Sequence, residues 1–276
     1  MLFYCSYPRQ KPRSSEDTRM NYTHTHPLLG NPNALAIAHR GGALENEENT
    51  WDAFTHAIAL GYTHMELDVH ATRDGVVVIH HDPDLSRVFK DPRQIAQMDY
   101  AELAQLRSPK GAQIPKLEDL LSHDPNINLI IEAKTRDVVE PLCAVIQRLG
   151  AIKRVCIGAF DPACTAQARA LLGPDLLWSP AHAQVARLWA RGWGLPLSLA
   201  DFRVVQVPAR WKGIAVVTPR FIRAAHAAGI AVQVWTVNER AQMNRLLDMG
   251  VDGLITDKPT LLREILIERG TWPLSA

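Results

Sequence analysis

The sequence predicts an α/β fold of the (β/α)8 TIM-barrel type, and three observations support this prediction. The chain has 276 residues, of which 47% are hydrophobic and 21% charged, so it can bury a substantial core and fits one large domain or two small ones. Short apolar runs alternate with longer segments whose apolar residues recur every three or four positions. Eight such alternations occupy about 240 residues, which is the usual size of this barrel.

Most of the expected strands are followed by an expected helix. Eight apolar runs have the length of a strand, at residues 34–39, 64–70, 128–134, 154–160, 176–179, 204–208, 232–237 and 253–257. Six segments have helical spacing and end at a glycine, a common C-terminal stop, at residues 50–61, 137–150, 162–173, 220–229, 239–250 and 260–270. The alternative is a doubly wound open sheet, but the glycine-rich turn expected after its first strand is absent.

Two segments and one terminus depart from this alternation. The run "GVVVIHH" at 75–81 predicts an extra strand, joined to the second one by an "RDG" turn. Residues 83–115 are polar and contain prolines, which indicates an insertion that leaves the barrel and returns. Residues 1–30 are expected to form a disordered tail, with Met20 as an alternative start, so the barrel domain would span residues 31–270.

Composition narrows the classes of function. The formal charge is +1, with Lys and Arg spread along the chain, and this gives no overall signature of a nucleic-acid or acidic membrane partner. No apolar run approaches the roughly 20 residues of a transmembrane helix. Cys5, Cys143, Cys156 and Cys164 show no CxxC spacing, so we expect buried thiols in a reducing, cytoplasmic setting.

The strand at 64–70 carries charge on one face. Side chains alternate along a strand, so Glu66, Asp68 and His70 share one face while the apolar residues share the other. If the apolar face packs outward against helices, the two carboxylates point into the barrel, which is costly without a cation. An edge strand with a solvated face would also explain this pair by itself.

A third carboxylate favours the metal hypothesis. The strand at 128–134 ends with Glu132 and Lys134, two positions apart and therefore on one face. Active sites of this barrel lie at the C-terminal ends of its strands. Three oxygen ligands without a nearby cysteine favour a hard divalent ion, Mg²⁺ or Ca²⁺.

Two histidines are candidates for proton transfer. The first strand ends in His39 and Arg40, followed by Gly41 and Gly42, which would let the backbone approach a ligand closely. The second histidine comes from "IHHD", where alternation alone does not choose between His80 and His81. Two imidazoles beside a metal cluster suit an acid and base pair for phosphoester cleavage.

Eight motifs resemble those of the glycerophosphodiester phosphodiesterase family in order and spacing. They are "AHRGG", "ENT", "ELDV", "TRDGVVVIHHD", "IPKLEDLL", "IEAK", "VWTVN" and "GLITDKP", and the resemblance runs from about residue 27 to 266. It implies a metal-dependent barrel that hydrolyses glycerophosphodiesters to sn-glycerol 3-phosphate and an alcohol.

The resemblance also implies roles for individual residues. Glu66, Asp68 and Glu132 match metal ligands, and His39 and His81 match the acid and base pair, since His81 directly precedes Asp82. Arg40 and Lys134 match residues that contact the phosphate, and Glu48 and Trp235 match residues that line the pocket. The usual Pro before "ENT" is replaced and acids stand at 45 and 47, which leaves the loop shape and ion preference open.

Several alternatives stay open at this point. A lysophospholipase D would fit the same chemistry, with an apolar lip formed by residues 83–115 and 189–202. A barrel without catalysis could act as a binding protein, although both histidines and all three carboxylates are present. The nucleophile is either water or a hydroxyl of the substrate's glycerol, and the head group and the oligomeric state are open. Asp257 is expected to cap the following helix.

Overall fold

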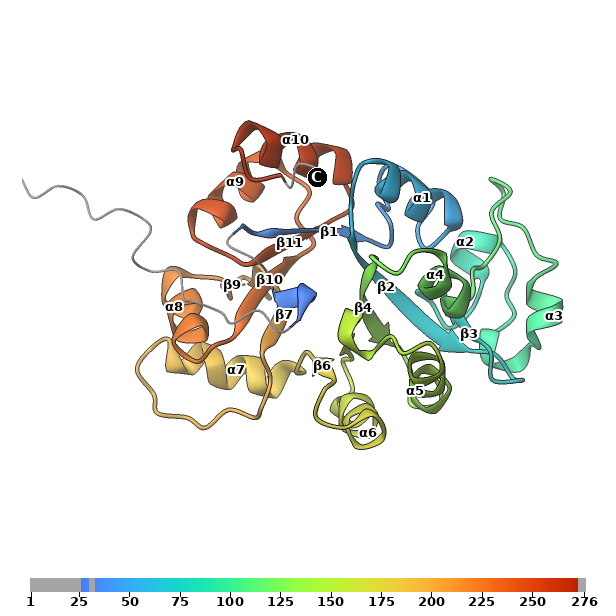
Figure 1. Ribbon diagram of the computed structural model, residues 1–276, viewed down its shortest axis with the longest axis horizontal. Coiled ribbons are helices and arrows are strands. Elements are labelled where there is room, and N and C mark those ends of the chain that lie inside the picture. Colours follow the sequence, from blue (N-terminus) through green and yellow to red (C-terminus); the bar gives the residue numbers. More distant parts are fainter. Residues whose placement is uncertain (1–25, 30–32, 273–276) are drawn as a thin grey trace, which may run out of the picture.

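The computed structural model describes residues 26–29 and 33–272 and shows strands ringed by helices (Figure 1). Eight parallel strands pair in the order β6-β5-β4-β2-β1-β11-β10-β7, as a barrel requires. The fold predicted from the sequence is confirmed. The barrel strands are β1 (Leu35–His39), β2 (His64–Ala71), β4 (Asn128–Ala133), β5 (Val155–Gly158), β6 (Leu177–Trp178), β7 (Val204–Pro208), β10 (Ala231–Trp235) and β11 (Gly253–Thr256).

A helix follows each barrel strand along the chain and covers the outside of the ring (Figure 1). The α1 helix begins after Thr50, whose side chain accepts a hydrogen bond from the backbone of Ala53 and satisfies one of the helix's free N–H groups. The outer helices are α1 (Trp51–Ala59), α4 (Leu117–His123), α5 (Val139–Arg148), α6 (Pro162–Leu172), α7 (His182–Arg191), α8 (Pro219–Ala227), α9 (Arg240–Asp248) and α10 (Pro259–Glu268).

The extra strand and the insertion lie beside β2. Strand β3 (Val77–Ile79) pairs antiparallel with β2, with Val69 opposite Ile79, as the hairpin pattern predicted. The insertion carries α2 (Ser86–Phe89), η3 (Ile95–Gln97) and α3 (Tyr100–Leu103). Its buried side chains form a small core of their own, which includes Leu85, Val88, Phe89, Ile95, Met98 and Leu103.

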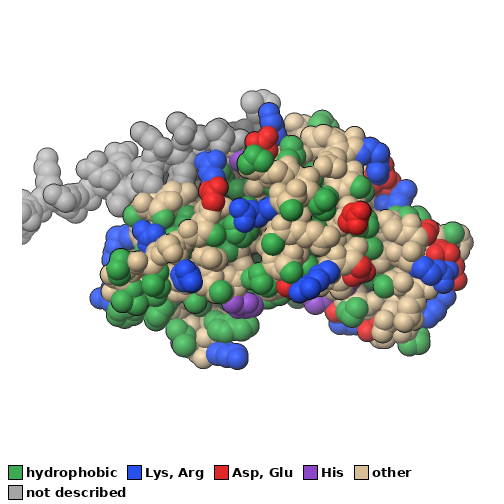
Figure 2. Space-filling model, turned by 90° about the horizontal axis from the view of Figure 1, so that it is seen from below, with side chains coloured by type: hydrophobic (Ala, Val, Ile, Leu, Met, Phe, Trp, Pro, Cys, Tyr) green, Lys and Arg blue, Asp and Glu red, His purple; other side chains and the backbone are tan. Residues whose placement is uncertain are grey.

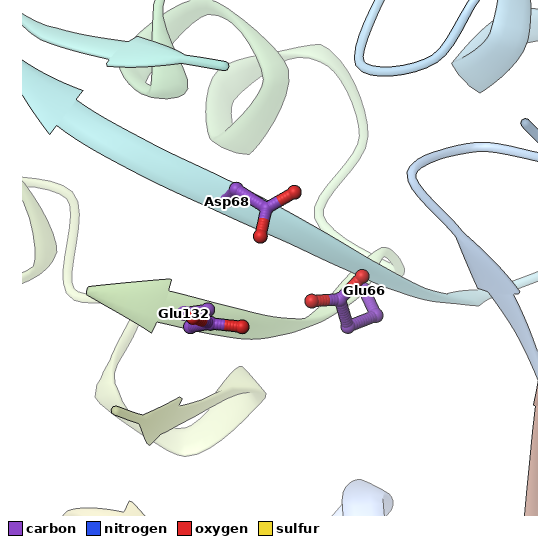
Figure 3. Close-up of side chains that lie close together, drawn as sticks. All are labelled: Glu66, Asp68 and Glu132. Atoms are coloured by element: carbon purple, nitrogen blue, oxygen red, sulfur yellow. The ribbon is translucent and has the colours of Figure 1, made fainter. Parts of the chain in front are cut away.

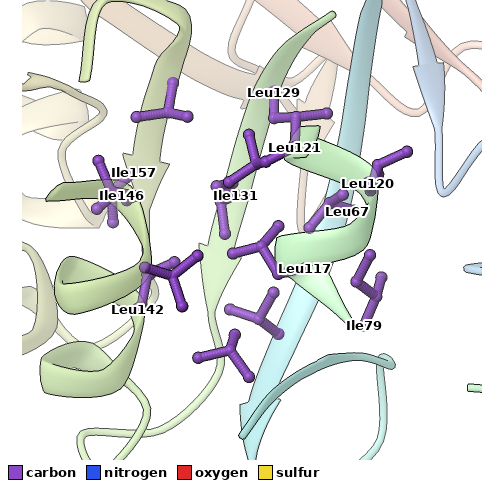
Figure 4. Close-up of a cluster of buried hydrophobic side chains, with 14 of the residues drawn as sticks. Leu67, Ile79, Leu117, Leu120, Leu121, Leu129, Ile131, Leu142, Ile146 and Ile157 are labelled. Carbon is purple, nitrogen blue, oxygen red and sulfur yellow. The ribbon is translucent and has the colours of Figure 1, made fainter. Parts of the chain in front are cut away.

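Apolar side chains on the outer face of the strands pack under the helices. Leu67 on β2, Ile131 on β4 and Ile157 on β5 are fully buried against leucines of α4 and α5 (Figure 4). This is the packing expected when one face of each strand faces helices. The opposite faces of the same strands therefore point into the barrel, and this is what directs Glu66, Asp68 and Glu132 inward.

The inside of the barrel is filled near the start of the strands. The short helix η2 (Pro27–Leu29) inserts Leu28 and Leu29 among interior residues that include Ile37, Ile130 and Ile255. Gln233 of β10 donates a hydrogen bond to the Leu28 carbonyl at 2.7 Å. The last residues of the predicted tail are thus part of the barrel, while Met20 lies outside the described residues.

Two features were not predicted. The two ends of the strand path, β6 and β7, are joined by a hydrogen bond from the backbone N–H of Gln206 to the hydroxyl of Ser179, which follows β6, at 3.1 Å. A small hairpin, β8 (Arg210–Trp211) and β9 (Ile214–Ala215), follows β7. No helix in the described residues is both long and apolar enough to cross a membrane.

Candidate active site

Three carboxylates meet inside the barrel, where Glu66 and Asp68 project from β2 and Glu132 projects from the C-terminal end of β4 (Figure 3). The two strands are paired so that Asp68 lies directly opposite Glu132, and Glu66 precedes Asp68 by two positions on the same face. One oxygen from each side chain lies within 4.8 Å of the others. The structure therefore brings the three sequence-predicted ligands into one cluster.

Burial and neighbouring cations act differently on two of these acids. Burial raises the pKa of Glu66 to about 8, and the charge of Asp68 adds to this effect. Burial would also raise the pKa of Asp68, but the charges of Lys134 and Arg40 outweigh it and hold that pKa below the usual value. Asp68 is thus held ionised by its two cations, whereas Glu66 resists ionisation when no further cation is near.

The donor set of the cluster fits a divalent metal ion. The buried Oε2 atom of Glu66 has no hydrogen-bond partner among the described residues, and buried oxygens of this kind are costly. Carboxylate oxygens are the ligands that Mg²⁺ and Ca²⁺ prefer. Lys134 lies at the edge of the cluster, with Nζ 2.9 Å from Asp68 and 2.8 Å from Glu132.

His39 stands at the end of β1 and is held from behind by a carboxylate. Its Nδ1 atom lies 2.5 Å from Oδ1 of Asp257, and Asn238 donates a hydrogen bond to the other Asp257 oxygen at 2.7 Å. The Nε2 atom of His39 lies 3.5 Å from Glu66. Burial lowers the pKa of His39, but the charges of Glu66 and Asp257 outweigh it and raise that pKa above its ordinary value.

Asp257 was expected to cap the last helix, and that expectation is wrong. The residue at the N-cap of α10 is Lys258, whereas both oxygens of Asp257 are engaged by His39 and Asn238. The backbone of Asp257 follows β11, next to β1 in the sheet, so its side chain reaches the neighbouring strand end. Asp257 is therefore a site residue that the sequence alone assigned to another role.

The second imidazole at the site is His81. Its Nδ1 lies 2.6 Å from Oδ1 of Asp82, whose other oxygen accepts a hydrogen bond from Arg87 at 2.6 Å. His80 points the other way and is buried with its ring 5.9 Å from that of Phe89. Strand alternation did not decide which of the two histidines belongs to the site. In the structure, His81 faces the cavity and His80 does not.

Arg40 is held in an uncommon backbone conformation beside the acids. Its φ is +51°, which lies in the left-handed region that residues other than glycine rarely adopt. Its Nε lies 3.0 Å from Asp68, and its Nη1 donates to Glu48 at 3.0 Å. Glu48 also binds Arg87. Glu48 thus bridges the two arginines. It is not among the residues that line the cavity, where the resemblance had placed it.

The loop between β1 and α1 is shaped by close packing. A Cβ at Gly41 would lie 2.7 Å from the Cβ of Ala53, so this glycine lets the backbone pack closely against α1. The sequence had instead suggested that it lets the backbone approach a ligand. Glu45 accepts two hydrogen bonds from Thr260 at the start of α10. Glu47 accepts one from Ser108 of the insertion. Both additional acids of this loop are thus engaged by other parts of the fold.

A cavity of about 520 Å³ opens over the cluster. One part of its wall is polar and consists of His39, Arg40, Glu66, His81, Glu132 and Lys134. Another part is aromatic: Phe160 lies 6.4 Å from the ring of Trp235 and 5.5 Å from that of His182, which is 5.2 Å from Trp211. Trp235 was expected here, whereas Phe160, His182 and Trp211 were not.

One further polar residue supports the acids. Asn49 donates a hydrogen bond to Asp68 at 3.0 Å and has a φ of +58°. Asn49 belongs to the "ENT" motif. The motif indicated that this segment lies near the site, but it did not predict the hydrogen bond from Asn49 to Asp68. Asn49 orients the carboxylate that also contacts Arg40 and Lys134.

Comparison with known proteins identifies the family. Residues 39–261 match the model of the glycerophosphoryl diester phosphodiesterase family. The chain is 39% identical to the Mycobacterium tuberculosis protein named "Probable glycerophosphodiester phosphodiesterase 2", over 86% of this chain and 92% of that protein. It is 26% identical to human lysophospholipase D GDPD1, over 83% of this chain and 85% of that protein.

Solved structures agree with this result. A glycerophosphodiester phosphodiesterase from Parabacteroides distasonis superposes with a TM-score of 0.70 and 27% identity, covering 86% of this chain and 98% of that one. A phosphodiesterase from Oleispira antarctica, solved with the product sn-glycerol-3-phosphate, gives a TM-score of 0.70 and 22% identity, covering 84% and 96%. The chain belongs to the glycerophosphoryl diester phosphodiesterase family.

Proposed function

We propose that this chain hydrolyses glycerophosphodiesters to sn-glycerol 3-phosphate and an alcohol, with Glu66, Asp68 and Glu132 as metal ligands and His39 and His81 as the acid and base. The observation that carries the proposal is that the acidic cluster and both imidazoles open on one cavity. The family membership gives the reaction class, and the product named for the Oleispira antarctica structure fits it.

The three carboxylates would hold Mg²⁺ or Ca²⁺, because their hard oxygen donors suit either ion. When bound, such an ion polarises a phosphoryl oxygen and offsets negative charge. Arg40 and Lys134 border the same space and supply permanent positive charge for the phosphodiester. Asn49 and Glu48 hold Asp68 and Arg40 in place.

Each histidine has a carboxylate on Nδ1, from Asp257 for His39 and from Asp82 for His81. This arrangement fixes the ring and leaves Nε2 as the atom that exchanges a proton with the substrate. One histidine takes the proton of the nucleophile, and the other donates a proton to the leaving alkoxide. If a glycerol hydroxyl attacks first, a cyclic phosphate forms, and phosphorus NMR during turnover distinguishes this route from direct attack by water.

The test is hydrolysis of glycerophosphocholine by the parent and by His39→Ala, His81→Ala and Glu132→Gln. General acid–base catalysis contributes about 10²- to 10⁴-fold, so each histidine variant should lose at least about 100-fold in kcat. His123→Ala, in the exposed end of α4, is the matched control and should keep the parental rate. If both site histidine variants hydrolyse the substrate at the parental rate, His39 and His81 are not the acid and base, and the alternative of a non-catalytic binding protein gains support.

The aromatic wall favours lysophospholipids as a second class of substrate. Trp189, Trp211 and Ile214 extend the cavity wall beyond Phe160 and provide apolar surface that suits an acyl chain. The human relative named lysophospholipase D is consistent with this candidate. Comparing kcat/KM for lysophosphatidylcholine and glycerophosphocholine tests it: Ile214→Asp should reduce the first much more than the second.

The domain and location predictions also remain proposals. The proposed catalytic domain covers residues 31–270 together with η2, which precedes them and packs inside the barrel. Its insertion at 83–115 contacts the site loop through Ser108. A cytoplasmic setting is supported by the thiols of Cys143, Cys156 and Cys164, which are all buried and free. Small-molecule diesters are the proposed partners.

A further inference from the structure

Acidic residues are scarce on one side of this protein, so that side carries a net positive charge. Residues 176–238 contain seven Lys and Arg but one acidic residue, Asp201, so the net charge of +1 for the whole chain conceals a basic region. This region builds α7, α8 and the hairpin β8–β9, which lie together in Figure 1. Figure 2 shows hydrophobic and basic side chains together at lower left, on the side of these elements, while most acidic ones lie to the right.

Large apolar side chains are exposed in the same region. Trp193 is 60% exposed and Leu195 54%, both in the loop after α7, and Ile214 is 59% exposed in the hairpin. Trp211, opposite Ile214 in the hairpin, is 42% exposed. We call these four residues, with Leu197 and the cations Arg187, Arg191, Arg210, Lys212 and Arg220, the basic-aromatic surface.

Among the described residues, no acid neutralises the cations of the basic-aromatic surface. Within the described part of the chain, none of its five cations has a carboxylate within ion-pair distance. Arg220 instead stacks 4.5 Å from the ring of Trp193, and Lys212 lies 5.9 Å from that of Trp211. Arg187 and Arg191 donate to backbone carbonyls of Ser198 and Leu197.

This surface is continuous with the wall of the cavity. Trp189 lines the cavity and donates a hydrogen bond from its indole to the Ala215 carbonyl in the hairpin, at 3.2 Å. Its ring lies 5.7 Å from that of Trp193. Trp211 and Ile214 line the cavity as well as being exposed. The basic-aromatic surface therefore borders the entrance through which a substrate reaches the site.

We propose that the basic-aromatic surface docks the protein on anionic lipid bilayers, with the cavity entrance facing the membrane. Exposed Trp and Ile side chains partition into the interfacial region of a bilayer, where indole rings are favoured, and unpaired Lys and Arg attract anionic head groups. A second copy of this chain would bring the same unneutralised cations and repel the first. An anionic bilayer complements both the charge and the apolar side chains.

The experiment is co-sedimentation of the full chain with vesicles of phosphatidylcholine alone and of phosphatidylcholine mixed with phosphatidylglycerol. The parent should bind the mixed vesicles, and added salt should weaken that binding. Lys212→Glu and Trp193→Ala should each reduce the partition coefficient by roughly five-fold or more. The matched controls Lys153→Glu and Leu171→Ala change an exposed cation and an exposed apolar residue elsewhere, and should bind as the parent does.

Hydrolysis of glycerophosphocholine in solution and the thermal midpoint are measured for every variant. Neither Trp193 nor Lys212 lines the cavity, so both variants should keep the parental solution rate. If Trp193→Ala does not fold, Leu195→Ser replaces it. Three results would each overturn the proposal of membrane docking. They are failure of the parent to bind mixed vesicles, equal binding by the parent and the two variants, and dimerisation that Trp193→Ala abolishes. Loss of the solution activity in the parent bears instead on the proposed function.

Discussion

At the scale of single residues, the site is assembled by contacts between side chains that lie far apart in the sequence. Glu66 and Asp68 were placed together by their spacing, and the register of β2 with β4 sets Glu132 beside them. The contact between His39 and Asp257 spans 218 positions of sequence. Nothing in the local pattern distinguishes such a partner from a helix cap, because both follow a strand and precede a proline.

Asp257→Asn should impair the reaction without unfolding the protein. The change removes the negative charge that holds the His39 ring, so kcat should fall by about 10- to 100-fold while KM changes little. Steady-state kinetics with glycerophosphocholine gives this division. Asp252→Asn breaks another carboxylate–imidazole pair, with His226, and serves as the control. A kcat loss in Asp252→Asn as large as that in Asp257→Asn would contradict a specific role for Asp257.

Direct metal binding tests the acidic cluster without relying on turnover. Titration calorimetry of the chelator-treated protein with Mg²⁺ and with Ca²⁺ should show one site, and Asp68→Asn should weaken it by at least ten-fold because a central carboxylate loses its charge. Glu140→Gln, in the first turn of α5, should bind as the parent does. Unchanged affinity in Asp68→Asn would place the ion elsewhere.

At the scale of elements, the helices and strands that could be predicted are those long enough for their apolar residues to recur at a regular spacing. All eight barrel strands overlap the expected runs, and β3 lies inside its expected run. The hairpin β8–β9 has strands of two residues, too short for any alternation to show. The left-handed conformations of Lys212 and Gly213, with φ of +46° and +84°, form its tight turn.

The packing of the insertion predicts how stability depends on pH. Burial lowers the pKa of His80 to about 4, whereas the unfolded chain has an ordinary value near 6.5. Below that value the unfolded state binds a proton that the folded state refuses, so the stabilisation present above pH 6.5 is lost as pH falls towards 4. At pH 5 the loss is about 2 kcal/mol.

His80→Asn removes this titration. Urea unfolding at pH 7 and pH 5 should therefore show a smaller decrease in unfolding free energy for His80→Asn than for the parent. His123→Asn changes an exposed imidazole at the end of α4 and is the matched control, which should follow the parent. The same pH dependence in His80→Asn and in the parent would mean that His80 does not couple to folding.

At the scale of the whole molecule, the sequence predicted eight strands and their helices but not what completes the barrel. Closure of the barrel depends on the contact of β6 with β7. Strand β6 has only two residues, too few to show a pattern in the sequence. The interior near the start of the strands is filled by η2, from a stretch in which two leucines give no periodic signal. The tail was therefore expected to extend to residue 30, whereas its last residues close one end of the barrel.

Filling of the barrel end by η2 makes Leu28 a stabilising residue. Its side chain is fully buried among interior residues of several strands, although it lies outside every predicted element. Leu28→Ala should reduce the unfolding free energy by about 2–5 kcal/mol, as large-to-small changes in cores do. Leu44→Ala, at a position that is 61% exposed, should change it by less than about 0.5 kcal/mol. Urea denaturation followed by circular dichroism measures both. Equal stability of Leu28→Ala and the parent would show that the barrel closes without η2, and that the sheet and its helices suffice to hold the site.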